Sequence, residues 1–266
     1  MSGKASGRAR ALFANPAVRL VLFLVGAGLF VLAIYAAWIG SSDGMRAFSR
    51  AMENPGTLGA LVLLPLVCLT LASMSFWVLT LRFGKVGCGE MLALLGGAWL
   101  LNYLPLKPGV AGRVAYHKHV NGIDFRWSLV VVIQSIVVGL ACFVTQVALA
   151  SIAAERAWSE WGRASFIASP LVLAILGLAL PRKGMTAHGW RYSAAFAFRY
   201  ADSLVWSLRY WLLFSVAGRP QGVSTTSAIA GISQSASLIP IAGNGLGVRE
   251  WMVGLAARSL PEWYGK

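Results

Sequence analysis

The residues best suited to bind a ligand stand near the carboxyl end of the sequence. Pro240 and a Gly-rich turn containing Asn244 are followed there by Arg249 and Glu250. Such a turn ends one helix and starts another, and the new helix N-terminus offers unpaired N–H groups and a positive dipole end to an anion. Arg249 adds a planar fork of donors that matches phosphate oxygens. Glu250 either orients Arg249 or couples protons; alternatively, the two residues form an interfacial ion pair that fixes the turn.

Four further residues could contact the same ligand. A comparable turn earlier in the chain contains Lys107 and Arg113, which either bind an anion or anchor the chain to the inner leaflet. Asp202 lies in an apolar stretch, where a carboxylate is costly and marks a functional site by default. Its alternative role is a salt bridge with Arg199, three residues earlier on the same helix face. Gln234 belongs to a Ser- and Thr-rich run that either lines a headgroup path or packs helices closely.

The sequence predicts no catalytic centre. It contains no GxSxG, HExxH, phosphate-loop or paired-carboxylate pattern. His117 and His119 lack a carboxylate partner at a zinc-site spacing, so we expect no metal and no cofactor. Cys68, Cys88 and Cys142 show no CxxC spacing and are interpreted as buried small hydrophobic residues. We therefore expect a protein that binds or moves a ligand and is not an enzyme.

Composition places these residues in a membrane protein. The chain has 266 residues, of which 58% are hydrophobic and 12% charged, whereas a soluble domain carries about 25% charged residues. Apolar segments of about 20 residues recur, each long enough to cross the hydrocarbon layer as a helix, and they lack the alternation of a barrel strand. The net charge of +14 would suggest nucleic acid in a soluble protein. Here the basic residues lie mainly between apolar segments, so an all-α polytopic membrane protein with no nucleic-acid partner is expected.

The apolar pattern predicts both continuous and broken helices. Continuous helices are expected at 17–40, 57–83, 127–153, 164–180 and 193–217. Two stretches interrupted by small or turn-forming residues, and one short closing segment, are expected at 90–106, 223–241 and 248–260.

Loop charges predict the orientation. The basic N-terminal segment should be cytoplasmic, because positive loops are retained on that side. If 90–106 spanned the membrane, the basic region 107–126 would lie outside. Treating 90–106 as a re-entrant hairpin removes this conflict and leaves 107–126 as a cytoplasmic loop. Gly96, Gly97, Pro105 and Pro108 are the residues expected where a membrane helix is broken. The chain is therefore expected to be a multi-pass protein of the plasma (inner) membrane.

An internal repeat is predicted from two pairs of motifs. Trp77 and Trp211 each precede a glycine by seven residues and are 134 positions apart. Pro105 and Pro240 also precede a glycine by seven and are 135 apart. With the charge-based orientation, the two halves have inverted topology, which is a recurrent transporter design with the binding site where the broken segments meet.

Two membrane repeats follow from this pattern. The first, 1–153, contains two helices, the re-entrant segment and a third helix. The second, 154–266, is inverted and stops before a counterpart of the helix at 127–153, so we expect it to lack its last helix.

The run from Pro240 to Glu250 resembles the P-x-x-G-G-x-G-x-R-E signature of the flippase-like membrane domain family, the family of the lysylphosphatidylglycerol synthase transmembrane region. The block from Pro105 to Arg113 resembles an earlier motif of that family, and the similarity extends over nearly the whole chain. Asn244 stands where the family usually has Gly, and no aminoacyl-transferase domain is attached. The resemblance implies movement of an anionic, aminoacylated or isoprenoid lipid between leaflets.

Three functional hypotheses follow. The first is a lipid translocase that uses the cationic turns to hold a phosphate headgroup. The second is a secondary transporter of a small soluble anion, and the third is a non-transporting scaffold for a lipid-modifying enzyme. A cavity open sideways to lipid would favour the first, and a cavity sealed from lipid the second. The expected partners are a membrane phospholipid or isoprenoid lipid, and a second copy of the chain or a lipid-synthesis enzyme.

Overall fold

The computed structural model describes residues 49, 53–102, 108–179, 189–238 and 252. The chain divides into two compact units, Met1–Arg50 and Ala51–Lys266, and all helices discussed below belong to the second. The predicted helix at 17–40 lies outside the described residues, as does the segment 248–260 apart from residue 252.

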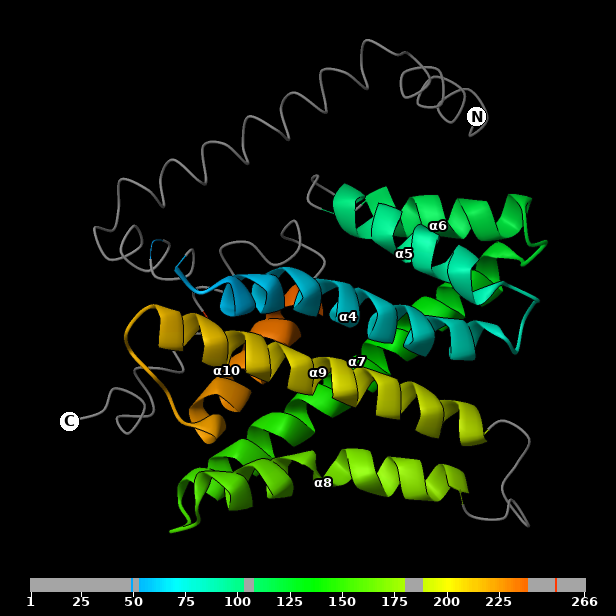
Figure 1. The fold of residues 1–266 in the computed structure, drawn as a ribbon. Coiled ribbons are helices and arrows are strands. Elements are labelled where there is room, and N and C mark those ends of the chain that lie inside the picture. Colours follow the sequence, from blue (N-terminus) through cyan, green and yellow to red (C-terminus); the bar gives the residue numbers. More distant parts are fainter. Residues whose placement is uncertain (1–48, 50–52, 103–107, 180–188, 239–251, 253–266) are drawn as a thin grey trace. The chain divides into compact units, whose positions relative to one another are not determined.

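The described part of the chain is helical and contains no strand (Figure 1). Its helices are α4 (Pro55–Thr80), α5 (Cys88–Leu101), α6 (Pro108–His119), α7 (Phe125–Ala154), α8 (Glu160–Ala179), α9 (Gly189–Val216) and α10 (Val223–Leu238). The helices predicted at 57–83, 127–153, 164–180 and 193–217 are confirmed as α4, α7, α8 and α9, with ends shifted by a few residues.

Three of the described helices are long and apolar enough to cross a membrane: Pro55–Thr80, Phe125–Ala154 and Glu160–Leu178. Many of their large apolar side chains are exposed, as expected for helices that face lipid. The equally long α9 is not among the three because it is more polar. Its charged residues are Arg191, Arg199, Asp202 and Arg209.

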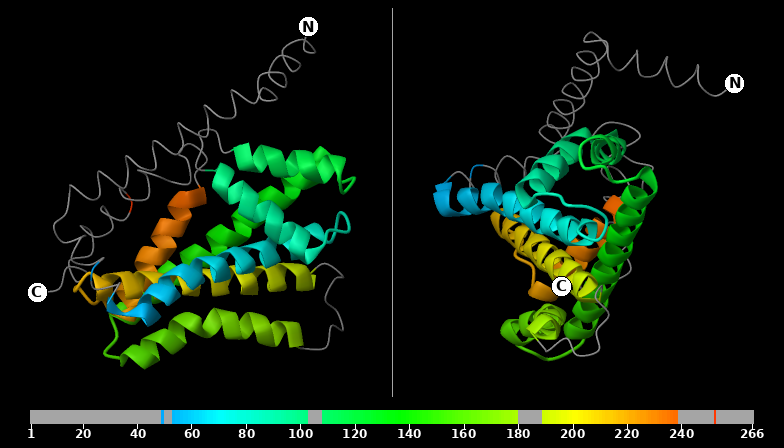
Figure 2. Two further views of the ribbon diagram at one scale, coloured as in Figure 1. Left: turned by 45° about the horizontal axis from the view of Figure 1, so that its top comes forward. Right: turned by 90° about the vertical axis from the view of Figure 1, so that its right-hand side faces the viewer.

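Helices α4 and α9 pack side by side and run antiparallel (Figures 1 and 2). Near the end of α4, the Ser75 hydroxyl donates a hydrogen bond of 3.0 Å to the carbonyl of Ala195, near the start of α9. Leu79, one turn further along α4, lines a pocket with Arg191, one turn earlier in α9. Residue numbers therefore rise along one helix as they fall along the other.

Helices α5 and α6 form a hairpin in which the start of α5 lies beside the end of α6. Asn121, just after α6, donates a hydrogen bond of 2.9 Å to Glu90 in the first turn of α5. Ile123 packs there against Val86 and Met91, and the Trp77 indole of α4 donates to the Val86 carbonyl at 2.8 Å. The hairpin thus begins and ends beside the end of α4 and the start of α7. This end of the bundle is called the basic end below.

The prediction that 107–126 is a loop was wrong, because residues 108–119 form α6. Pro108 occupies the first helical position, where the missing N–H costs nothing. Val114 and His117 are buried on one side of the helix. Its low apolar content concealed it from a search for membrane-length hydrophobic runs.

Helix α10 starts from the opposite end of the bundle and packs along α7 (Figure 2). Its first N–H, at Val223, donates a hydrogen bond of 2.8 Å to Glu160 at the start of α8. Its last residue, Leu238, packs against Cys142 and Phe143, near the middle of α7. Helix α10 therefore extends from the end opposite the basic end to about the centre of the bundle.

Substitution of Gly109 tests the closeness of the α5–α6 contact. A Cβ at Gly109 would lie 2.2 Å from the backbone oxygen of Ala98, and backbone cannot move aside cheaply. We expect Gly109→Ala to lower the free energy of unfolding by about 1–3 kcal/mol, measured by circular dichroism in detergent. Gly97→Ala is the matched control, because its Cβ would meet nothing within 4 Å. The control should be neutral or stabilising; equal losses in both variants would contradict the packing.

Candidate functional site

The most deeply buried charge among the described residues is the carboxylate of Asp202, halfway along α9. It is 1% exposed, and its Oδ2 accepts a hydrogen bond of 2.6 Å from Arg199, one turn earlier. This contact confirms the salt bridge considered from the i, i+3 spacing. A charged pair at this depth is costly in an apolar bundle unless geometry and hydrogen bonds compensate for the lost hydration.

Cys68 and Arg209 lie next to this pair. We call the four residues Cys68, Arg199, Asp202 and Arg209 the central charge cluster. The thiol of Cys68, halfway along α4, lies beside the Asp202 carboxylate and the Arg209 guanidinium. Arg209 also rests on the Trp206 ring, with its guanidinium carbon 4.0 Å from the ring centroid. The cluster holds two guanidinium groups and one carboxylate, so it has an excess of one positive charge.

A glycine on α7 lies beside the Arg199 side chain. A Cβ at Gly139 would lie 3.4 Å from the Arg199 Nε, at the near limit of ordinary contact. The Arg199 guanidinium carbon also lies 5.0 Å from the centroid of the Phe143 ring, within the range of a cation–π interaction. Helix α7 therefore presents a small residue and an aromatic face to this cation at the level where α10 ends.

A buried polar network continues from the central charge cluster toward the opposite end. Gln146 of α7 donates a hydrogen bond of 2.5 Å to Ser207 and accepts one from Ser203, the residue that follows Asp202. Tyr210 and Ser233 share a hydrogen bond of 2.8 Å that joins α9 to α10. These contacts place hydroxyl and amide groups between α7, α9 and α10.

An apolar groove of about 370 Å³ lies beside this network, between α8, α9 and α10. Its lining residues are Ala164, Ile167, Ala168, Leu204, Ser207, Leu208, Trp211, Val223, Thr226 and Ser227. Leu208 and Trp211 are 45% and 42% exposed, so the groove reaches the lipid-facing surface of the bundle. The groove thus connects that surface with Ser207, which accepts a hydrogen bond from Gln146.

Arg113 is a deeply buried cation and belongs to the candidate site residues that the structure describes. It is 6% exposed, and its guanidinium carbon lies 4.1 Å from the centroid of the Phe76 ring on α4. It sits on α6, within the hairpin that opens at the basic end. A guanidinium held over an aromatic ring keeps its hydrogen-bond donors available to an anion.

The structure places the other predicted site residues as follows. Gln234 is buried in α10. Lys107, Asn244, Arg249 and Glu250 lie outside the described residues. Of the candidates, only Asp202 is seen with its expected partner, and no described contact joins it to Arg113.

A hydrogen-bonded network joins the start of α5 to the end of α6. The His117 Nδ1 and Asn121 Oδ1 lie 3.1 Å apart, and Asn121 and the Gly87 N–H both donate to Glu90. These two hydrogen bonds lower the pKa of Glu90. Burial lowers the pKa of the His117 imidazole, and the neighbouring Arg113 adds to this effect. The folded hairpin therefore favours neutral His117 and ionised Glu90.

Sequence reasoning missed part of the site. Cys68 is buried as predicted, but its position beside Asp202 depends on a contact between helices that are far apart in the chain. Cys88, expected to be buried, is exposed, because it is the first residue of α5 at the basic end. Among the described residues, no group of three or more His, Cys, Asp or Glu side chains could hold a metal ion.

No protein-family model, no curated protein and no solved structure matches this chain. The residues of the site are therefore weighed on their geometry and chemistry alone.

Separating the central pair should destabilise the fold. Removal of one partner leaves the other charge buried and unpaired, so we expect Arg199→Gln to cost about 3–5 kcal/mol of unfolding free energy. The double variant Arg199→Gln/Asp202→Asn should lose less than the sum of its single variants, as measured by detergent-induced unfolding. Arg163→Gln removes a comparable but exposed pair with Glu160 and should cost less than about 1 kcal/mol. Additive losses at Arg199 and Asp202 would contradict a coupled pair.

Acidification should loosen the α5–α6 hairpin. Because the folded state disfavours protonated His117, stability falls as the pH drops below the ordinary histidine pKa of about 6.5. Because it favours ionised Glu90, a further loss begins below that carboxylate's ordinary pKa. We expect the thermal midpoint to fall between pH 8 and pH 5, and His117→Gln to reduce this fall. An identical pH profile for both proteins would show that His117 does not contribute.

Proposed function

We propose that this chain is a multi-pass lipid translocase of the plasma (inner) membrane with a cytoplasmic N-terminus. The observation that carries the proposal is that two short helical units start from opposite ends of a bundle with a buried charge cluster at its centre. The α5–α6 hairpin starts from the basic end, α10 starts from the opposite end, and α10 ends near Phe143, beside Arg199. Broken segments that enter from both sides and meet near the midplane form the binding sites of many transporters.

Inverted repeats are part of this proposal, and the α4–α9 pair supports them. Asp202 is 134 positions after Cys68, the same offset that relates Trp77 to Trp211. These two matched positions lie beside one another, halfway along helices that run antiparallel. A two-fold axis in the membrane plane would bring matched residues together at the centre of the bilayer.

The groove between α8, α9 and α10 favours a lipid over a soluble anion. It reaches the lipid-facing surface through Leu208 and Trp211, whereas a soluble substrate would need a path sealed from hydrocarbon. Acyl chains could remain in such a groove while the polar headgroup follows the Gln146 and Ser207 network toward Arg199. This arrangement agrees with the resemblance to the flippase-like membrane domain family.

The proposed substrate is a lipid with an anionic phosphate, either a phospholipid, an aminoacylated phospholipid or an isoprenoid lipid. Arg113 and the central charge cluster would offer guanidinium groups to the phosphate. Lys107 would belong to the turn between α5 and α6, and Asn244, Arg249 and Glu250 to the turn that follows α10. Asp202 would hold Arg199 in place when no phosphate is bound.

Leaflet exchange in proteoliposomes tests the proposal. Fluorescent phosphatidylglycerol in the outer leaflet is destroyed by an impermeant reductant, so the rate of its exchange can be followed. The native chain should accelerate exchange over protein-free vesicles. Arg113→Gln and Asp202→Asn should each slow it about tenfold or more, as expected when a hydrogen bond to a charged group is lost.

Arg156→Gln is the control for this assay, because Arg156 is exposed in the loop between α7 and α8. Circular dichroism verifies that each variant is folded. If the native chain exchanges no phosphatidylglycerol, phosphatidylcholine or isoprenoid phosphate, lipid translocation is wrong. Uptake of labelled inorganic phosphate or sulfate in the same vesicles would then identify a transporter of soluble anions.

A further inference from the structure

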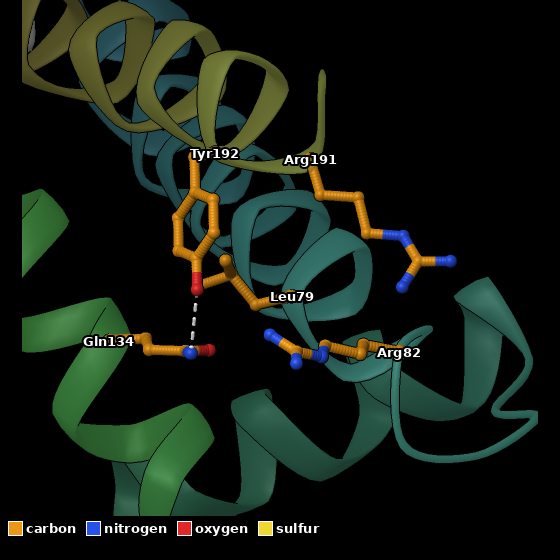
Figure 3. A pocket seen from close by; sticks show the side chains of 5 residues that line it. All are labelled: Leu79, Arg82, Gln134, Arg191 and Tyr192. Atoms are coloured by element: carbon orange, nitrogen blue, oxygen red, sulfur yellow. Dashed lines mark hydrogen bonds between the residues drawn. The ribbon is translucent and has the colours of Figure 1, made fainter. Parts of the chain in front are cut away.

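A small pocket at the basic end gathers two arginines from different helices. It is lined by Leu79, Arg82, Gln134, Arg191 and Tyr192, from the ends of α4 and α9 and from α7, and none of the five is acidic. Figure 3 shows Arg82 extending toward Gln134 and Tyr192, and Arg191 extending from the first turn of α9 toward α4. The enclosed part of the pocket is only about 10 Å³, about enough for one water molecule, so a phosphate group would sit across its open mouth.

The electrostatics of this pocket call for an anion. Arg82 and Arg191 both line the pocket and no carboxylate does, so their positive charges are not balanced within the pocket. The N-terminus of α9 points here as well and adds the positive end of its dipole. Arginine at such a place matches the geometry of phosphate oxygens, which it can bind with two parallel hydrogen bonds.

The polar groups of the pocket are arranged as donors. The Gln134 amide donates a hydrogen bond of 2.8 Å to the Tyr192 hydroxyl, which leaves the hydroxyl hydrogen free to be donated to a ligand. The buried Nε of Arg191 has no hydrogen-bond partner among the described residues. A tetrahedral anion at the mouth of the pocket would accept from Arg82 and from this hydroxyl, and Arg191, which also lines the pocket, would add positive charge.

Aromatic rings place the pocket at the depth of lipid headgroups. The Arg82 guanidinium carbon lies 5.5 Å from the Phe83 ring centroid, and that of Arg191 lies 5.6 Å from the Trp190 ring centroid. Phe83 itself stacks on Trp127, with ring centroids 5.0 Å apart. Tryptophan and arginine at the end of apolar helices are typical of the membrane–water interface.

We infer that Arg82, Arg191 and Tyr192 form a binding site for the phosphate group of an anionic phospholipid at the basic end. The site is separate from the central charge cluster and from Arg113. A role for this site in holding a lipid before it moves inward rests on the proposed function. The binding of a phosphate group at this site does not depend on it.

Native mass spectrometry of the intact, detergent-solubilised chain measures this binding directly. The probes are phosphatidylglycerol, diacylglycerol with the same acyl chains, and inorganic phosphate. We expect phosphatidylglycerol to bind at least about tenfold more tightly than diacylglycerol, and Arg82→Gln/Arg191→Gln to abolish that difference. Binding should weaken with added salt, because Arg82 is exposed.

The matched control is Lys85→Gln/Arg126→Gln, which removes two positive charges from the same end without touching the pocket lining. It should change phosphatidylglycerol affinity by less than about threefold, since surface charges contribute little once screened. Equal losses in both double variants would overturn the site and leave only a generally basic surface. Inorganic phosphate that binds as tightly as phosphatidylglycerol would overturn the assignment to a lipid.

A milder variant separates binding from folding. Tyr192→Phe keeps both charges and removes only the hydroxyl, so it should weaken phosphatidylglycerol binding about fivefold; unchanged affinity would overturn the proposed role of this hydroxyl. Because binding is measured without leaflet exchange, the two proposals fail separately. Arginine-dependent binding without exchange would refute translocation alone, and exchange without arginine-dependent binding would refute the pocket alone.

Discussion

A carboxylate held away from water must be matched by positive charge, and the packing around α9 follows from that requirement. Asp202 reaches Arg199 within its own helix, and the Arg199 side chain passes beside Gly139 of α7, where a Cβ would come within 3.4 Å of its Nε. The thiol of Cys68 then brings α4 against the other side of the carboxylate. Three helices are thus arranged around one ion pair. The same pair makes α9 more polar than the three described helices that are apolar enough to cross a membrane.

The two short helical units obey a related constraint, because a helix that ends inside an apolar bundle still has unpaired backbone groups at its termini. Each unit carries a glutamate at its start. Glu90 accepts the Gly87 N–H at the N-terminus of α5, and Glu160 accepts the first N–H of α10. These carboxylates lie at opposite ends of the bundle and come from different places in the chain, since Glu90 belongs to α5 itself and Glu160 to α8.

Much of this fold could be predicted from apolar runs, because length and hydropathy alone identify helices such as α4 and α7. The i, i+3 spacing also predicted the Arg199–Asp202 pair, since a helix fixes the geometry of such neighbours. Contacts between distant segments could not be predicted this way. Nothing near Cys68 in the sequence indicates Asp202. Arg82 and Arg191 were missed for another reason: as positive residues beside membrane helices they already had an explanation in topology. Only their shared place in the lining of one pocket gave them a second explanation.

The capping of the two short helices differs in a way that bears on how the chain assembles. Glu90 belongs to α5 itself, so that helix can complete its first turn as soon as it is synthesised. Helix α10 takes its capping carboxylate from α8, 63 residues earlier. Because chains fold from the N-terminus as they are made, α8 is in place before α10 emerges. The second short helix therefore reaches its native start only by docking on an earlier segment, so α8 acts as a template during insertion.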